Sequence, residues 1–243
     1  MLTLGRELAK ISEVYVAAPT VEKSGASHSM TGNIPIRVYR QKLPGITDHA
    51  WAIEGTPTDC AKLALSELMP ELPDIVISGI NHGANLGTDV IYSGTVGAAT
   101  EGYCYGCSAI AVSVTGNGMV KDVGNFAYAA EFTKKLCLEM SARDFQPRMF
   151  LNVNVPGRTP DDVRGVKYTY MGWRWYKDPF TKRVDPRGKE YYWLQGQFDD
   201  TGCGVGSDVE ACADGYISVT PLHLDQTDYE ALSALHKTNL FSF

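Results

Sequence analysis

The sequence predicts an α/β fold with a mostly parallel, Rossmann-like β-sheet that is covered by helices on both faces. Short apolar runs rich in β-branched residues alternate with helical patterns, and this alternation is typical of a parallel sheet. The runs at 75–77, 108–114 and 149–155 are almost continuously apolar, which indicates strands buried on both faces. With 243 residues, 44% hydrophobic and 21% charged, the chain can bury a large core.

The elements before residue 75 follow from periodicity and stop signals. Apolar residues recur at helical spacing over 2–11, and residues 14–18 form a strand candidate that ends at a proline. A stretch rich in Ser, Thr and Gly, 20–33, has no apolar periodicity and is predicted to be a loop. Short strands are expected at 34–39 and 50–53.

Three residues predict the start of the next helix. Thr56 suits the N-cap, Pro57 the first helical position and Asp59 the first turn, where a carboxylate interacts favourably with the helix dipole. The helix is expected to end before Pro70. We interpret Asp59 as a helix-start residue.

A buried strand followed by a polar glycine loop marks the centre of the chain. The strand at 75–77 leads into residues 78–87, which hold three glycines and two asparagines and allow a ligand to approach the backbone closely. Ser93, Gly94 and Thr95 then precede a helix, whose free N–H groups attract anions. No lysine follows the glycines, so this is no Walker loop, and a βα turn with a polar insertion is the alternative. We predict the functional site here.

An aromatic-rich segment follows the helix predicted at 123–140 and the strand at 149–155. Two β segments, 166–175 and 190–194, flank a polar connection that resembles a turn, and we interpret them as a β-hairpin arm. A lone hairpin cannot bury its tryptophans and tyrosines. Either a homo-oligomer contact or docking on the core is therefore expected.

The chain is predicted to have three parts. Residues 1–157 form the core, 158–205 the β-rich arm, and 206–243 a segment that returns to the core or to a partner subunit. The last part is expected to contain a short helix at 207–213, a strand at 216–222 and a terminal helix around 227–236.

Charge and cysteine usage limit the function classes. The formal charge of -6 and a pI near 5.4 exclude a broad basic face for a nucleic acid polymer. No apolar run is long enough to span a membrane, and six scattered cysteines fit the cytoplasm. Cys104 and Cys107 form a C-x-x-C without a second pair, so packing is favoured over a redox or zinc role.

Several motifs resemble those of one family. SGINHGANLG and YSGTVGAATEG in the centre, GTPTDCAKLAL before them, and APTVEKSGASHSMT, DPRGKEYYW and GYISVTPLHLDQTDYEAL elsewhere are similar to motifs of the SurE family of metal-dependent 5′-nucleotidases. The resemblance covers nearly the whole chain. It implies hydrolysis of nucleoside monophosphates with one divalent ion, Mg²⁺ or Mn²⁺, and a β-rich arm for homodimer or homotetramer contact.

The resemblance also implies the site residues. In the family, two consecutive aspartates, a serine and an asparagine hold the metal, and Ser24 and Asn81 match the serine and the asparagine. Ser93, Gly94 and Thr95 match the segment that contacts the phosphate. Hydroxyl and amide oxygens are suitable ligands for Mg²⁺ or Mn²⁺, and carboxylates supply the charge that holds the ion.

The aspartate pair of the family, with the strand before it, has no counterpart in the sequence, so no catalytic residue is assigned. That strand would lie mid-sheet, between the strands at 14–18 and 75–77. We therefore expect residues 1–243 alone to be poorly soluble or partly molten, and inactive on nucleoside monophosphates with Mg²⁺ or Mn²⁺. Asp89 is the first candidate to replace a missing carboxylate.

Alternatives remain for single residues and for the function. Ser24 also suits a loop cap, Asn81 a turn with positive φ, and Thr95 a helix cap. His82 is either a proton donor or a packed or exposed histidine. The chain could instead be a catalytically silent homologue that binds nucleotide or only oligomerises. A dinucleotide-binding oxidoreductase would need a GxGxxG motif, which the sequence lacks.

Overall fold

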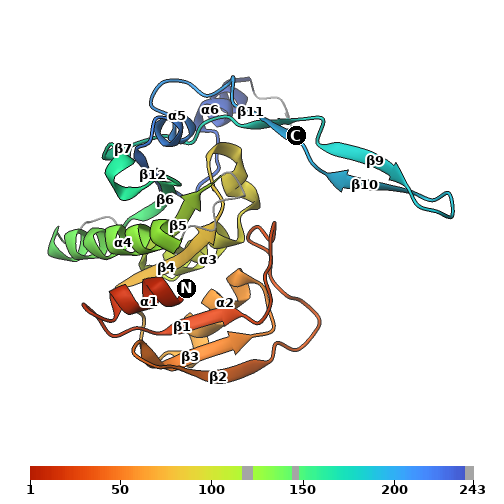
Figure 1. Ribbon diagram of the computed structural model, residues 1–243. Helices are drawn as coiled ribbons and strands as arrows, with labels where there is room; N and C mark the ends of the chain where they lie inside the picture. The colour runs from red at the N-terminus through yellow and green to blue at the C-terminus, as the bar shows by residue number, and fades with distance from the viewer. Residues whose placement is uncertain (117–122, 144–147, 239–243) are drawn as a thin grey trace.

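A five-stranded sheet forms the centre of the computed structural model, which describes residues 1–116, 123–143 and 148–238 (Figure 1). Its strand order is β4-β5-β6-β12-β7, and three of its four pairings are parallel. The strands are β4 (Ile75–His82), β5 (Ser108–Thr115), β6 (Phe150–Pro156), β7 (Val166–Tyr168) and β12 (Ile217–Leu222). The predicted α/β fold with a mostly parallel sheet is confirmed.

A second, three-stranded sheet lies below the first in Figure 1 and has the order β1-β3-β2. It consists of β1 (Val16–Pro19), β2 (Val38–Leu43) and β3 (Thr47–Ile53). Among the described residues, β1 pairs only with β3, and β4 pairs only with β5. In the described part of the chain, β1 and β4 are therefore edge strands of their sheets, as are β2 and β7 at the opposite edges.

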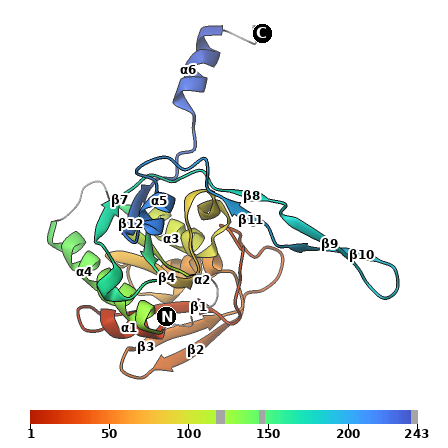
Figure 2. The same ribbon diagram turned by 45° about the horizontal axis from the view of Figure 1, so that its top comes forward.

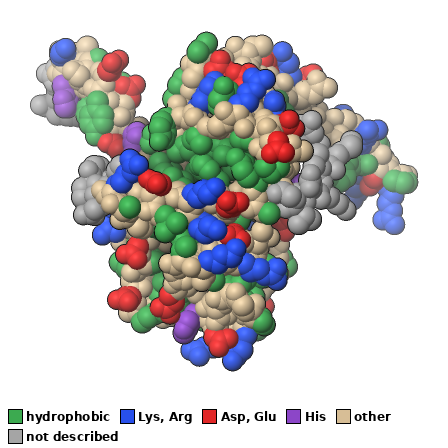
Figure 3. All heavy atoms as spheres, turned by 60° about the vertical axis from the view of Figure 1, so that its left-hand side comes forward, with side chains coloured by type: hydrophobic (Ala, Val, Ile, Leu, Met, Phe, Trp, Pro, Cys, Tyr) green, Lys and Arg blue, Asp and Glu red, His purple; other side chains and the backbone are tan. Residues whose placement is uncertain are grey.

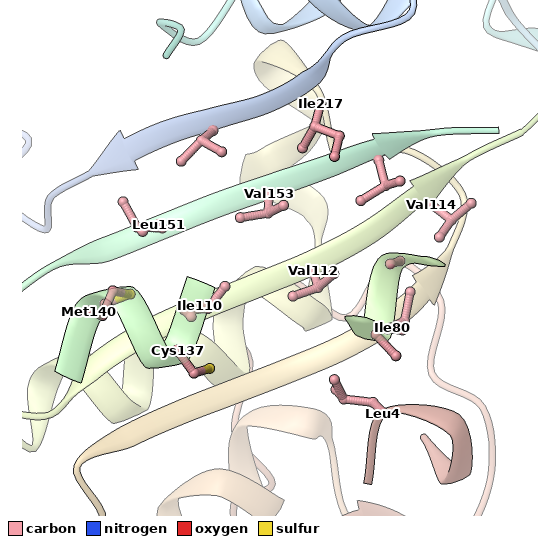
Figure 4. Packing of buried hydrophobic residues seen from close by; sticks show 14 residues of the cluster. Leu4, Ile80, Ile110, Val112, Val114, Cys137, Met140, Leu151, Val153 and Ile217 are labelled. Atoms are coloured by element: carbon pink, nitrogen blue, oxygen red, sulfur yellow. The ribbon is translucent and has the colours of Figure 1, made fainter. Parts of the chain in front are cut away.

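Helices cover both faces of the central sheet, as the alternation of buried residues along β5 shows. Ile110 and Val112 contact α1 (Leu2–Leu8) and α4 (Val123–Arg143) through one hydrophobic cluster, shown in Figure 4. Ala109 and Ala111 face the other way and pack against α3 (Gly94–Cys104). Successive side chains of a strand point to opposite faces, so a strand buried on both faces must be apolar throughout.

The helix start at Thr56 is confirmed. Thr56 Oγ1 accepts a hydrogen bond from Asp59 N at 3.0 Å, and Thr56 N donates to Asp59 Oδ2 at 2.8 Å, which is a complete capping box. The helix α2 (Pro57–Leu63) continues as a π-helical turn, η1 (Ala64–Leu68), before Pro70. The interpretation of Asp59 as a helix-start residue is thus confirmed.

Two strand predictions were shifted or too short. The strand expected at 34–39 is β2, which begins at Val38 and continues to Leu43, because its register is set by the hairpin with β3. The strand expected at 75–77 continues to His82 and includes half of the predicted glycine loop. Gly79 makes this possible: with φ at 136°, a Cβ there would lie 2.4 Å from Val112 O of the neighbouring strand.

The arm region also differs from the prediction. Residues 166–175 do not form one β segment: β7 joins the central sheet, whereas β8 (Trp175–Lys177) pairs with β11 (Gln197–Asp199). The chain leaves the sheet between them because Gly172 N donates to Asp208 Oδ1 at 2.8 Å. The polar connection contains a strand, β9 (Phe180–Val184), which pairs with β10 (Glu190–Leu194), and only the tight turn at 185–189 connects them.

The hairpin β9–β10 extends away from the body of the molecule (Figure 1), and so does the terminal helix α6 (Tyr229–Thr238) (Figure 2). The aromatic residues of β10 are exposed, as expected for a hairpin that extends away from the other described elements (Figure 1). The remaining helices are α5 (Asp208–Ala213), η2 (Gly87–Tyr92) and η3 (Pro160–Asp162).

The surface carries charged side chains of both signs. Lys and Arg side chains are interspersed with Asp and Glu on the face shown in Figure 3, beside one hydrophobic area. All six cysteines are free, including Cys104 and Cys107 of the C-x-x-C motif. Within the described ranges, no helix has both the length and the hydrophobicity needed to cross a bilayer.

Replacing Ile110 by Ala tests the assignment of the core. Ile110 is fully buried between β5 and α4, so Ile110→Ala should lower the free energy of unfolding by about 2–5 kcal/mol through lost burial and a residual cavity. Urea denaturation measures this change. Val184→Ala, at an exposed position of β9, is the control and should change the value by less than about 0.5 kcal/mol. Equal effects of the two variants would contradict the assignment.

Candidate active site

The N-terminus of α3 presents free backbone donors. Ser93 is its N-cap, and Ser93 Oγ accepts a hydrogen bond from Val96 N at 3.1 Å. Among the described residues, no acceptor is bonded to the N–H groups of Gly94 and Thr95, the first two residues of the helix. These two donors and the positive end of the helix dipole form an anion site.

The loop that carries Ser24 packs against this helix start. Ser27 N donates to Tyr92 O at 3.0 Å, and Ser27 Oγ donates to Ile91 O at 2.6 Å. A Cβ on Gly94 would lie 3.3 Å from the Cβ of Ala26, so the loop and the helix start are in direct contact. Ser24 itself is exposed and donates a hydrogen bond to Glu22 Oε1 at 3.2 Å.

Asn81 faces the same region from the end of β4. Asn81 Nδ2 donates to Gly83 O at 3.0 Å, which leaves Oδ1 without a hydrogen bond to any described residue. One cavity of about 1540 Å³ is lined by all five residues that the sequence predicted: Ser24, Asn81, Ser93, Gly94 and Thr95. The structure thus brings together residues that are up to 71 positions apart in the sequence.

The described residues supply part of a metal shell. Ser24 and Asn81 offer a hydroxyl and an amide oxygen, which are hard ligands of the kind that Mg²⁺ and Mn²⁺ prefer. No group of three or more His, Cys, Asp or Glu side chains able to hold a metal is present in the described ranges. Two neutral oxygens do not balance the charge of a dication, so these residues fit a metal only together with further carboxylates.

A comparison of the sequence with known families gives one match over most of the chain. The family model described as "Survival protein SurE" matches residues 1–178.

The chain belongs to the SurE family.

Relatives of this SurE-family chain share its sequence over most of their length. A protein named 5′-nucleotidase SurE from Heliobacterium modesticaldum is 47% identical over 221 residues, which cover 91% of this chain and 80% of the relative. Another of that name, from Syntrophomonas wolfei, is 44% identical over 96% of this chain and 86% of its own. The crystal structure of a SurE protein from Aquifex aeolicus superposes with a TM-score of 0.81 at 34% identity, over 98% of this chain and 93% of that one.

A buried network of amides holds the glycine loop of this SurE-family chain. Asn85 N donates to Asn154 Oδ1 at 2.9 Å, and Asn85 O accepts from Asn152 Nδ2 and Asn154 Nδ2 at 2.8 and 3.0 Å. Asn85 Nδ2 donates to Ser113 Oγ at 2.6 Å. The sequence analysis missed this network. The sequence feature that could have revealed this network is the pair of asparagines in the otherwise apolar run 149–155, because buried amides need hydrogen-bond partners.

Asp208 fixes the far end of the same loop. Its Oδ2 accepts a hydrogen bond from Gly87 N at 2.8 Å, and the carboxyl group is fully buried. Burial raises the pKa of Asp208, although hydrogen bonds from the N–H groups of Gly87 and Gly172 oppose this shift. Asp208 therefore connects the glycine loop, the base of the arm and α5.

Asp89 is ion-paired at the base of the arm. Arg174, which is 7% exposed, contacts Asp89 Oδ2 at 3.2 Å and Asp200 Oδ1 at 2.8 Å. Tyr176 OH donates to Asp89 Oδ1 at 2.6 Å, and burial together with this carboxylate raises the pKa of Tyr176. Asp89 lines the cavity, but its two oxygens are bonded to Arg174 and Tyr176, so it is not a free carboxylate for a metal.

His82 packs on a helix. Its ring lies 5.8 Å from the ring of Phe126 on α4, centroid to centroid, and it also lines the cavity. Of the two alternatives for His82, packing is therefore present in the structure.

Replacing Arg174 by Ala tests the ion-pair cluster. Arg174→Ala leaves two carboxylates without their buried partner and should lower the free energy of unfolding by about 3 kcal/mol, measured by urea denaturation. Lys177 pairs with Asp199 nearby but is 65% exposed, so Lys177→Ala is the control and should cost less than about 1 kcal/mol. A loss no larger than that of the control would show that the cluster does not anchor the arm.

Proposed function

We propose that this SurE-family chain is a 5′-nucleotidase that hydrolyses nucleoside 5′-monophosphates to nucleoside and phosphate with the help of one divalent ion, Mg²⁺ or Mn²⁺. The observation that carries the proposal is the single cavity that joins Ser24 and Asn81 to the open N-terminus of α3. The names of the two relatives, both 5′-nucleotidase SurE, support the same activity.

The phosphate group of the substrate is proposed to bind at the start of α3. The N–H groups of Gly94 and Thr95 and the Thr95 hydroxyl donate hydrogen bonds to its oxygens, and the helix dipole stabilises its negative charge. These donors are fixed before the substrate arrives, because Ser93 caps the helix and Gly94 packs against the loop of Ser24. They can therefore stabilise charge on the phosphate as the ester bond breaks without a costly rearrangement.

Ser24 and Asn81 are proposed to hold the divalent ion together with carboxylates beyond the described set. When bound, the ion polarises the phosphate and helps to activate water. Asn81 has its amide nitrogen bonded to Gly83 O, whereas its oxygen accepts no hydrogen bond from a described residue and can therefore serve as a ligand. Ser24 reaches the cavity from the opposite loop, and its present acceptor, Glu22, also lines the cavity.

A catalytically silent homologue is the second candidate function. The observation that favours it is the shortage of free carboxylates: of the three that line the cavity, Asp89 and Asp200 are both paired with Arg174, and Glu22 alone has no ion pair among the described residues. Such a protein would bind nucleotide at the start of α3, or only oligomerise, and would not release phosphate. The two candidates are separated by the Mn²⁺-dependent release of phosphate from a nucleoside monophosphate.

The arm is proposed to make a homodimer or homotetramer contact. Tyr192, Trp193 and Leu194 are 56%, 57% and 71% exposed on a two-stranded hairpin, which exposes more apolar surface than a monomer usually leaves in water. The division into a core (1–157), an arm (158–205) and a C-terminal part (206–243) belongs to the same proposal. The free cysteines fit a cytoplasmic protein, which we also propose.

Replacing Asn81 tests the metal site. Asn81→Ala removes a proposed ligand and should abolish Mn²⁺-dependent phosphate release while the unfolding temperature stays unchanged, since Asn81 is only partly buried. Phosphate release is measured colorimetrically with a nucleoside monophosphate. Gln41→Ala removes an exposed amide from β2 and is the control. Full activity of Asn81→Ala would sink the ligand assignment, and an inactive parent chain that still binds nucleotide would favour the silent homologue.

Shortening the arm tests the oligomer contact. Residues 179–194 are replaced by a short glycine linker, which keeps β8, β11 and the Arg174 cluster in place. The variant should form a smaller species than the parent chain in light scattering, because the exposed aromatic strand is gone. An oligomer of unchanged size would contradict the proposed contact.

A further inference from the structure

The loop at residues 20–31 carries Ser24 but forms no helix or strand of its own. Fixing the residues of a flexible chain costs conformational entropy, so a loop of this length needs specific contacts to hold one conformation. Two acidic side chains that are almost fully buried provide such contacts. They come from α2 and α3, and neither lines the cavity of the active site.

The first is Asp59, which is 4% exposed. Besides capping α2, it accepts a hydrogen bond from Thr31 N at 2.9 Å on Oδ1 and from Thr31 Oγ1 at 2.5 Å on Oδ2. Burial alone would raise the pKa of Asp59, but the hydrogen bonds from Thr31 and Thr56 outweigh it and lower the pKa. The carboxylate is therefore held in its charged form at the far end of the loop.

The second is Glu101, which is 3% exposed and lies on α3, two turns after the phosphate-binding start of that helix. His28 Nε2 lies 2.7 Å from Glu101 Oε1, and Lys62 Nζ lies 3.1 Å from Glu101 Oε2. A Cβ on Gly97 would lie 2.5 Å from Ser27 O, so the loop lies directly on the helix backbone at this point. The loop and the proposed phosphate site are thus parts of one packed unit.

We propose that Asp59 and Glu101 are positioning residues: they hold the 20–31 loop against α3 and thereby place Ser24 beside Ser93, Gly94 and Thr95. Thr56 adds a third contact, because Thr56 Oγ1 donates to Ser29 O at 2.7 Å. The motif GTPTDC, which the sequence analysis assigned to helix capping, thus acts on the active-site loop as well. Both carboxylates act through the loop and touch no reacting group.

Hydrogen exchange of single amides tests this inference without any need for activity. The Ser27 amide, bonded to Tyr92 O, and the Thr31 amide, bonded to Asp59, report directly on loop docking. Glu101→Gln should accelerate exchange of the Ser27 amide about tenfold, and Thr31→Val should do the same for the amides of residues 24–31, while β5 and β6 exchange as in the parent chain. Thr31→Ser keeps the hydroxyl and should restore the parent rates.

Glu7→Gln is the matched control. Glu7 also forms ion pairs with two cationic side chains, Lys10 and Lys134, but these join α1 to α4 rather than to the loop. Glu7→Gln should therefore leave hydrogen exchange of the loop amides unchanged. Unchanged loop exchange in both Glu101→Gln and Thr31→Val would overturn the proposal. So would equal acceleration in the loop and in β5, which would mean that the two carboxylates support global stability only.

A second readout connects the loop to substrate and rests on the proposed function. Thr31→Val should weaken binding of a nucleoside monophosphate in the presence of Mn²⁺ by about tenfold, measured by calorimetry, and Thr31→Ser should restore it. If Thr31→Val accelerates hydrogen exchange of the loop but leaves nucleotide binding unaltered, the placement of Ser24 at the site is overturned. If the parent chain binds no nucleotide, the proposed function fails, whereas faster loop exchange in the variants would still support the docking role of Asp59 and Glu101.

Discussion

The close packing of α3 is the constraint on which the site depends. Three glycines let this helix approach its neighbours: a Cβ on Gly102 would lie 2.4 Å from Val76 Cβ of β4, and one on Gly97 would lie 2.5 Å from Ser27 O. Gly94 also lies close to Pro57 at the start of α2, with 3.1 Å between its ideal Cβ and Pro57 Cγ. The helix is therefore fixed by the sheet, the 20–31 loop and α2 at once, and its N-terminus faces the cavity with free N–H groups.

Buried polar groups fix the loops around that helix. The Asn85 network holds the glycine loop to β5 and β6, and Asp208 holds its end to the base of the arm. Buried groups of this kind specify one conformation because each lost hydrogen bond leaves a desolvated partner. The loops that line the cavity are thus held by the core, which suits the proposed phosphate site because its donors must already be in place.

An ion-pair cluster connects the base of the arm to the cavity. Arg174 forms ion pairs with Asp89 and Asp200 and so connects the arm to η2, the segment just before Ser93. The arm base and the segment before α3 are therefore joined through the ion pairs of one largely buried arginine.

The sequence by itself determined the α/β class, the capped starts of α2 and α3, and the five candidate residues that line one cavity. These features are local, since a β-branched run, an N-cap serine or a glycine before a helix acts on its neighbours in the chain. The family membership also followed from motifs that stand in a fixed order.

Only the tertiary structure decided which distant groups meet. The pairing of Arg174 with Asp89, the second role of Asp59 at Thr31, the burial of Glu101 and the separate partners of β7 and β8 all join residues more than 10 positions apart. Charge pairing and burial of this kind depend on how the elements pack, and a side chain that caps a helix shows no sequence signal for a second contact. The same carboxyl group can thus be predicted as a helix cap and found, in addition, to accept hydrogen bonds from Thr31 of the 20–31 loop.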